Sequence, residues 1–450
     1  MIQSLFMLNA ATGDVIIEKH YRGQTTRALV EVFWEIVSKA AKAEDVAPVI
    51  PTSKYYLFNV LRGGVFMLAA VCKEVPALLV TEFVHRIADV LELYLGDVTE
   101  RSLTAHFTTV YQVLEEMMDS GIPLMSEPNA LVDIVRPPRG IGQFVAEMFT
   151  GRKSSVAESL TASATSVIPW RRADVAYATN EIFFDITEDI DCIIEPNGTV
   201  AANAVKGTVW CSCQLSGVPD LTLWFNNPSV IADPGFHPCV RLARFEKDKI
   251  ISFVPPDGPF KLMTYTAASK SHVSPIYVRP TVHWHASAAR VSIVLATKPI
   301  AVGGALLRST ITSSSGVGVS MGGPGTGAAG EDGAAVEGVS LIVQFPPAII
   351  SADLTPTKGH VAYDTTTNRL AWTLGAIPAS SAPFELAGSI HIAPGSRPPL
   401  EPIDATLHFS MTGTTATGLA VRELRLLNDS YRYTKASRAI LRTGRFQIRM

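Results

Sequence analysis

The segment Trp170–Ile186, WRRADVAYATNEIFFDI, separates two parts of the chain with different sequence patterns. The residues before it predict one compact domain and a tether. The residues after it predict an all-β domain whose first strand is Glu181–Ile186. Side chains alternate between the two faces of a strand, so Phe183 and Asp185 share one face. The opposite face holds Ile182, Phe184 and Ile186.

A carboxylate beside an aromatic ring on one strand face can bind a ligand that carries a hydroxyl group on a ring. Asp185 would accept the hydrogen bond of the hydroxyl, and Phe183 would pack against the ring. The same alternation is also typical of a half-buried edge strand with a solvated aspartate. The pattern by itself leaves both interpretations open.

Composition excludes several classes of protein. The chain has 450 residues, of which 47% are hydrophobic and 18% charged, as expected of two or three folded domains. The net charge of −3 excludes a globally basic nucleic-acid-binding protein. Five cysteines, few and odd in number, favour a reduced, cytosolic protein. The start, MIQSLFMLNA, lacks the pattern of a signal peptide, and no run reaches the ~18 apolar residues of a membrane span, so any work at a membrane requires recruitment.

The first 125 residues predict a sheet with helices on its faces. The expected strands are 2–9, 15–21, 55–61 and 65–72, and the first two form a hairpin around Thr12-Gly13-Asp14. A helix is expected at 27–42, and two further helices carry apolar stripes at helical spacing after residue 82. From 136 to 168, Pro, Ser, Ala and Thr predict a linker.

Short strands separated by turn residues follow Trp170, which predicts a β-sandwich or two joined sandwiches. After the first strand, the expected strands are 205–215, 221–225, 250–254, 260–266, 276–281, 290–295, 339–345, 360–363, 369–374, 386–392 and 405–411. The run SSSGVGVSMGGPGTGAAGEDGAA at 313–335 has the composition of a disordered loop.

No stretch predicts a catalytic centre or a metal site. His283 and His285 would share a strand face, but no nearby acid or cysteine completes a set of ligands, and Trp284 between them indicates sheet packing. The acidic cluster of Glu188, Asp189 and Asp191 is expected to face solvent. The sequence therefore predicts a protein that is not an enzyme and holds no cofactor or metal. The sequence is more consistent with a protein that binds an extended peptide along an open sheet edge.

Several runs of the sequence resemble the medium (mu) subunits of clathrin-adaptor complexes, and together they span almost the whole chain. They are NEIFFDI at 180–186, LSGVP at 215–219 and SFVPPDGPFKLMTY at 252–265, in the order and at the separations of the family. Within the family, the subunit of adaptor protein complex 3 is most similar. That likeness rests on IPWRR at 168–172, FHPCVR at 236–241 and GRFQIR at 444–449.

The resemblance implies an α+β fold with three regions. These are a longin-like α/β domain at 1–135, a flexible linker at 136–168, and an all-β, immunoglobulin-like two-part sandwich (the mu homology domain) at 169–450 with its disordered loop at 313–335. It also implies a heterotetramer with large beta-type and delta-type subunits and a small sigma subunit. Such a complex works in the cytoplasm, peripherally on Golgi and endosomal membranes and coated vesicles.

The resemblance further implies binding of Tyr-x-x-Φ sorting signals, where Φ is bulky and apolar. These signals lie in the tails of membrane proteins carried from Golgi or endosome toward lysosome or vacuole. The tyrosine-pocket positions of the family fall on Phe183, Asp185 and Arg438. The Φ-pocket positions fall on Ile182, Phe184, Val421, Leu424 and Ser437.

Two positions depart from the better-known pattern of the family. Ala436 stands where the plasma-membrane type has a tryptophan that walls the tyrosine pocket, and Ser212 stands where it has a lysine. An aromatic ring stacked on a ligand ring contributes about 1 kcal/mol, so its loss predicts weak binding. The alternative function is an assembly-only subunit that has lost signal binding.

Overall fold

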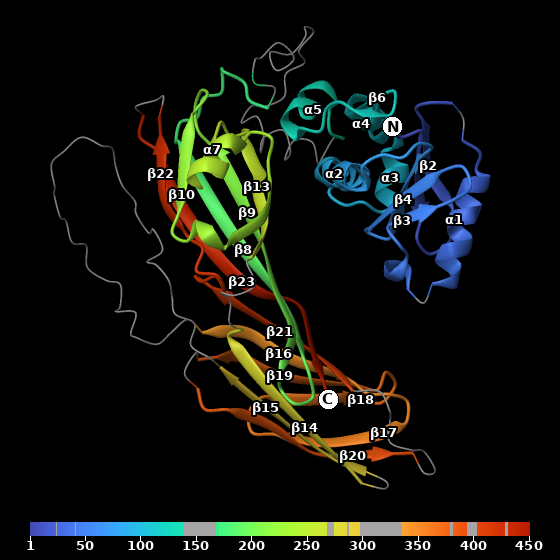
Figure 1. The fold of residues 1–450 in the computed structure, drawn as a ribbon, viewed down its shortest axis with the longest axis vertical. Helices are drawn as coiled ribbons and strands as arrows, with labels where there is room; N and C mark the ends of the chain where they lie inside the picture. Colours follow the sequence, from blue (N-terminus) through green and yellow to red (C-terminus); the bar gives the residue numbers. More distant parts are fainter. Residues whose placement is uncertain are drawn as a thin grey trace, which may run out of the picture. The chain divides into compact units, whose positions relative to one another are not determined.

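The computed structural model describes residues 1–23, 25–40, 42–138, 168, 170–267, 274–285, 288–297, 335–378, 381–393, 403–427 and 431–450 (Figure 1). The chain forms two compact units. One holds Met1–Tyr177 with the short segments Ser216–Val218 and Pro256–Gly258, and the other holds the remaining residues. The linker expected at 136–168 and the loop expected at 313–335 lie almost entirely outside the described residues.

The first unit is built on a five-stranded antiparallel sheet in the order β2-β1-β5-β4-β3. Its strands are β1 (Ser4–Asn9), β2 (Val15–His20), β3 (Val49–Pro51), β4 (Tyr56–Arg62) and β5 (Val65–Val71). The central strand β5 is buried at every residue, because its sequence VFMLAAV is apolar on both faces. Both faces of this sheet must therefore be covered.

Helices cover the two faces of this sheet. On one face, α1 (Ala28–Lys39) packs Leu29 and Phe33 against Phe66 of β5. The opposite face carries α2 (Ala77–Leu95) and α4 (Phe107–Met117), together with the short α3 (Glu100–Ala105) and α5 (Pro128–Ile134). A two-residue strand pair, β6 (Met118–Asp119) and β7 (Ile122–Pro123), follows α4. The sheet with helices on both faces confirms the predicted longin-like α/β architecture.

The described residues of the second unit form three sheets. The largest has nine strands in the order β11-β13-β9-β8-β23-β21-β16-β19-β18, and the others are β12-β10-β22 and β14-β15-β20-β17. The strands are β8 (Glu181–Ile194), β9 (Val200–Gln214), β10 (Leu221–Phe225), β11 (Ile231–Phe236), β12 (Ile251–Phe253), β13 (Gly258–Ala267), β14 (Ile276–Trp284), β15 (Ala288–Thr297), β16 (Val336–Gln344), β17 (Ile349–Pro356), β18 (His360–Asp364), β19 (Arg369–Ile377), β20 (Phe384–Ile392), β21 (Asp404–Thr412), β22 (Val421–Leu426) and β23 (Thr434–Arg449). One short helix, α7 (Leu242–Asp248), precedes β12.

Three long strands run through both halves of this unit (Figure 1). They are β8, β9 and β23, of 14, 15 and 16 residues. In one half, Ile190 of β8 packs in a core with Val291 of β15 and Trp372 of β19. In the other half, the large sheet lies beside the three-stranded sheet of β10, β12 and β22 (Figure 1). This is the predicted two-part sandwich.

Strand β8 corrects one expectation about the acidic cluster. It continues past Ile186 to Ile194, so the alternation that buries Ile186 also places Glu188 on the inward face. Glu188 is 0% exposed rather than solvated. In the second unit the sequence patterns also missed four strands, β11, β17, β22 and β23, and in the first unit they missed β3, β6 and β7. The strands that were predicted are present, most of them with shifted ends.

The five cysteines, all within the described residues, form no disulfide. Among the helices that the structure describes, none is long and apolar enough to cross a membrane.

Candidate peptide-binding site

Phe183 and Asp185 lie on the outward face of β8, as the alternation predicts. Phe183 is 39% exposed and Asp185 is half-buried, whereas Ile182 and Phe184 between and beside them are at most 2% exposed. The exposed Phe183 ring and the Asp185 carboxylate are two residues apart on one strand and therefore lie next to each other on this face. This face of β8 therefore offers an apolar surface and a negative charge only two residues apart.

Asp185 forms an ion pair with Arg438 of β23. The two residues are register partners across the parallel β8–β23 pair. Arg438 Nε and Nη2 donate to the two carboxylate oxygens at 3.0 and 2.9 Å. Arg438 is exposed and the half-buried Asp185 keeps 42% of its side chain in solvent, so the pair adds little stability and a ligand can reach it. The carboxylate accepts and the guanidinium donates, which matches the two hydrogen-bonding roles of a phenolic hydroxyl.

Small side chains flank Phe183 on both neighbouring strands. Its register partners are Ala436 on β23 and Ser212 on β9. Neither side chain is large enough to cover the aromatic ring. The Phe183 ring therefore forms an open apolar floor beside the Asp185–Arg438 pair.

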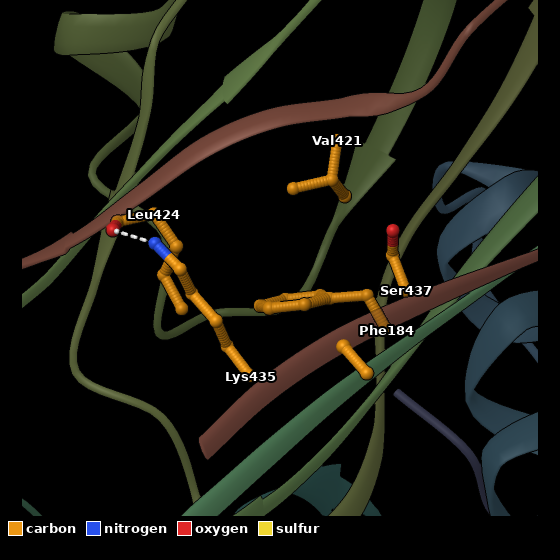
Figure 2. Close-up of a pocket in the computed structure, with 6 residues that line it drawn as sticks. Phe184, Val421, Leu424, Lys435 and Ser437 are labelled. Atoms are coloured by element: carbon orange, nitrogen blue, oxygen red, sulfur yellow. Dashed lines mark hydrogen bonds between the residues drawn. The ribbon is translucent and has the colours of Figure 1, made fainter. Parts of the chain in front are cut away.

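A pocket lies between β22 and β23, on the inward side of the sheet (Figure 2). Its lining consists of Phe184, Val421, Leu424, Lys435, Ala436 and Ser437. Phe184, Val421 and Leu424 are buried, and Ser437 is the register partner of Phe184. A largely apolar lining suits an aliphatic side chain rather than a charged one.

Lys435 reaches along this pocket to the neighbouring strand (Figure 2). Its ammonium donates to the carbonyl oxygen of Leu424 at 3.1 Å, and the hydroxyl of Tyr433 donates to the same oxygen at 3.3 Å. Burial, followed by the negative charge of Glu423, raises the pKa of Tyr433, so its hydroxyl stays a neutral donor. These two bonds tie the start of β23 to β22, and the alkyl stem of Lys435 adds apolar surface to the pocket.

The first five residues of β23 present an open strand edge. On one side, Thr434–Arg438 pairs with β8. On the other side, β21 pairs only with residues from Ile440 onward, and within the described ranges no strand pairs with 434–438 there. An open edge displays unpaired backbone N–H and C=O groups that can accept a further strand.

A family model of the medium subunits of adaptor complexes matches residues 168–450, well over half of the chain. The chain belongs to the adaptor complexes medium subunit family. A model of the clathrin adaptor complex small chain matches residues 1–137 of this medium subunit.

Relatives of the medium subunit match it from end to end. It is 34% identical over 452 residues to the AP-3 complex subunit mu-1 of Mus musculus and 35% identical over 450 residues to the AP-3 complex subunit mu-2 of Rattus norvegicus. Each alignment covers 100% of both chains. A structure described as a homology model of the full-length AP-3 complex in an intermediate open conformation matches 100% of both chains with a TM-score of 0.60 and 14% identity, which supports the fold alone.

The fold of this medium subunit gathers the predicted site residues into two groups. The outward group consists of Phe183, Asp185, Ser212 and Arg438, and Ala436 borders it. The inward group consists of Phe184, Val421, Leu424 and Ser437 around the pocket. Ile182 is buried on the inward side and does not line the pocket.

Sequence reasoning did not predict that Lys435 of the medium subunit lines the pocket between β22 and β23. A lysine is usually solvated, so its type gave no indication. Its position did, because Lys435 and Ser437 are two apart on one strand and must share a face. Within the described ranges, no three His, Cys, Asp or Glu side chains gather as metal ligands.

Proposed function

We propose that this medium subunit is the cargo-recognition subunit of a heterotetrameric vesicle-coat adaptor. It binds Tyr-x-x-Φ signals in the tails of membrane proteins transported from Golgi or endosome to lysosome or vacuole. Its partners are large beta-type and delta-type subunits and a small sigma subunit, and it acts from the cytoplasm, peripherally on the membrane. Full-length similarity to AP-3 mu subunits supports this proposal.

The observation that carries the proposal is the placement of two sites on opposite faces of one open edge. Residues three apart on an extended peptide point to opposite faces and lie about 10 Å apart. A peptide strand added beside Thr434–Arg438 would direct its tyrosine to Phe183 and Asp185 on the outward face. The Φ side chain would then enter the pocket that Phe184 and Leu424 line on the inward face.

The test is a titration of the full chain with a Tyr-x-x-Leu peptide and with its Tyr→Ala version. The parent protein should bind the Tyr-x-x-Leu peptide saturably and should not bind the Tyr→Ala version. Asp185→Ala should weaken binding by at least about tenfold, because a hydrogen bond to a charged group is lost. Asp189→Ala is the matched control, since Asp189 lies on the same face of β8 and also pairs with an arginine, Arg442. Equal affinity of Asp185→Ala and parent would contradict the site.

A second candidate function is an assembly subunit that binds no signal. The small residues Ala436 and Ser212 favour it, because neither of these two register partners of Phe183 adds an aromatic ring or a charge to the site. Absence of saturable binding by the parent, in a preparation that still assembles with the other subunits, would support this candidate.

A further inference from the structure

Trp210 is an exposed indole directly beside Asp185. It lies on β9, where it is the register partner of Asp185, and it is 44% exposed. Because β8 and β9 are antiparallel and register partners share a face, Trp210 stands on the same outward face as Phe183. Two large aromatic side chains are thus left open to solvent on adjacent strands around one carboxylate.

The geometry places Trp210 diagonally across from Phe183. Phe183 pairs with Ser212, and Trp210 is the next outward residue of β9. Diagonal neighbours on adjacent strands lie about 7–8 Å apart, a separation that an aromatic side chain can bridge. Arg438, Asp185 and Trp210 therefore form one row across three strands, and Phe183 lies beside the middle of that row, two residues before Asp185 on β8.

A neighbouring cation holds the indole of Trp210. The ammonium of Lys261, on β13, lies 5.6 Å from the centroid of the Trp210 ring. An ammonium over the face of an indole is attracted by the electron-rich ring, which favours one orientation of the side chain. The ring is thereby restrained before any ligand arrives.

We propose that Trp210 is the aromatic side wall of the tyrosine site. The inference rests on the proposed function, because its ligand is the tyrosine of an extended peptide. The tyrosine ring contacts Phe183 below and Trp210 at its side, and its hydroxyl reaches Asp185 and Arg438. Ala436 leaves the opposite side open, so Trp210 supplies the lateral aromatic contact from β9 instead of β23.

The test compares Trp210→Ala, Trp210→Phe and the parent, as full chains, in titrations with a Tyr-x-x-Leu peptide. Loss of an aromatic partner should weaken binding about five- to tenfold in Trp210→Ala, and Trp210→Phe should retain most of the affinity. Trp224→Ala is the matched control, since Trp224 on β10 also carries a cation, Arg425, 5.2 Å from its ring centroid. This control should bind within twofold of the parent.

Intrinsic fluorescence gives a second readout. The chain has six tryptophans, and the Trp210→Phe variant identifies which of them responds to the peptide. If Trp210 is the source, the peptide-dependent change in emission that the parent shows should disappear in Trp210→Phe. The inference is overturned if Trp210→Ala binds as the parent does, or if Trp224→Ala weakens binding equally. If Trp210→Ala binds as the parent does but Asp185→Ala still weakens binding, the proposed function is kept and only the role of Trp210 is rejected. A parent that binds no peptide overturns both.

Discussion

Glu188 and Asp189 are consecutive acidic residues of one strand, yet they differ in almost every physical respect. Glu188 points inward and is fully buried, where it accepts hydrogen bonds from Tyr265 and Thr417. Asp189 points outward and pairs with Arg442 in solvent, as Asp185 does with Arg438. The outward row keeps its charges accessible to a ligand, and the inward row holds the fold. We therefore expect outward substitutions to change binding and inward ones to change stability.

The largest expected effect is on stability, in Glu188→Ala. The carboxylate accepts from the Tyr265 hydroxyl at 2.6 Å, from the Thr417 backbone N–H at 3.2 Å and from the Thr417 hydroxyl. Removing it leaves these donors buried without a partner, at a cost of about 4 kcal/mol. Urea unfolding of the full chain measures the change. Glu188→Gln keeps an acceptor and should lose less than half as much, and a loss below about 1 kcal/mol in Glu188→Ala would contradict the role.

A second buried carboxylate, Asp257, predicts a pH dependence of stability. Burial raises its pKa to about 6, against the opposing effects of Arg171 and of a hydrogen bond from Tyr177. Between pH 4 and 6 the folded state keeps a proton that the unfolded state has lost, so this residue's contribution to stability falls as pH rises. The fall is about 3 kcal/mol from a shift of about two units.

The measurement is the difference in unfolding free energy between the parent and Asp257→Asn. Asparagine cannot titrate, so the parent should lose about 3 kcal/mol relative to the variant between pH 4 and pH 7. A difference that stays constant over this range would show that Asp257 titrates normally.

A smaller effect is expected from Gly207→Ala on β9. A Cβ atom there would lie 2.0 Å from the ring of Tyr265, whose hydroxyl binds Glu188. The ring must move, and overpacking of this kind costs about 2 kcal/mol. Combined with Tyr265→Ala, the substitution should cost clearly less than the sum of the two single variants, because the clash is gone. Strict additivity would argue against this contact.

The smallest effect on stability is expected for Asp189→Asn. The Asp189–Arg442 pair is exposed, and exposed pairs contribute less than about 1 kcal/mol, which salt reduces further. The same unfolding assay in low and high salt measures this difference. A loss comparable to that of Glu188→Ala would remove the distinction between the two faces of β8.

Which side chains of β8 point inward and which point outward could be predicted from sequence, because the alternation along a strand is a local property. It placed Phe183 and Asp185 outward and Ile182 and Phe184 inward, as the structure has them. The burial of Glu188 could not be predicted, since its partners Tyr265 and Thr417 lie 77 and 229 residues away in the chain. A charged residue type points to solvent unless such distant donors are known.

The strands β22 and β23 escaped prediction for a similar reason. Basic residues recur at 435, 438 and 442 and obscure the apolar alternation, although the alkyl stem of Lys435 lines a pocket. The residues of that pocket came from family resemblance rather than from pattern. Their meeting depends on β22 and β23 lying side by side, which no local period specifies.

The open edge at 434–438 also bears on self-association. Unpaired strand edges tend to pair with copies of themselves, and charged side chains along an edge oppose this. Here Lys435 and Arg438 stand within four residues of each other on the edge. Each face of the edge thus carries one basic side chain, Lys435 inward and Arg438 outward, and a second copy of the edge would bring two more of them. The edge can therefore remain receptive to a neutral or acidic peptide while the subunit stays dispersed at high local concentration.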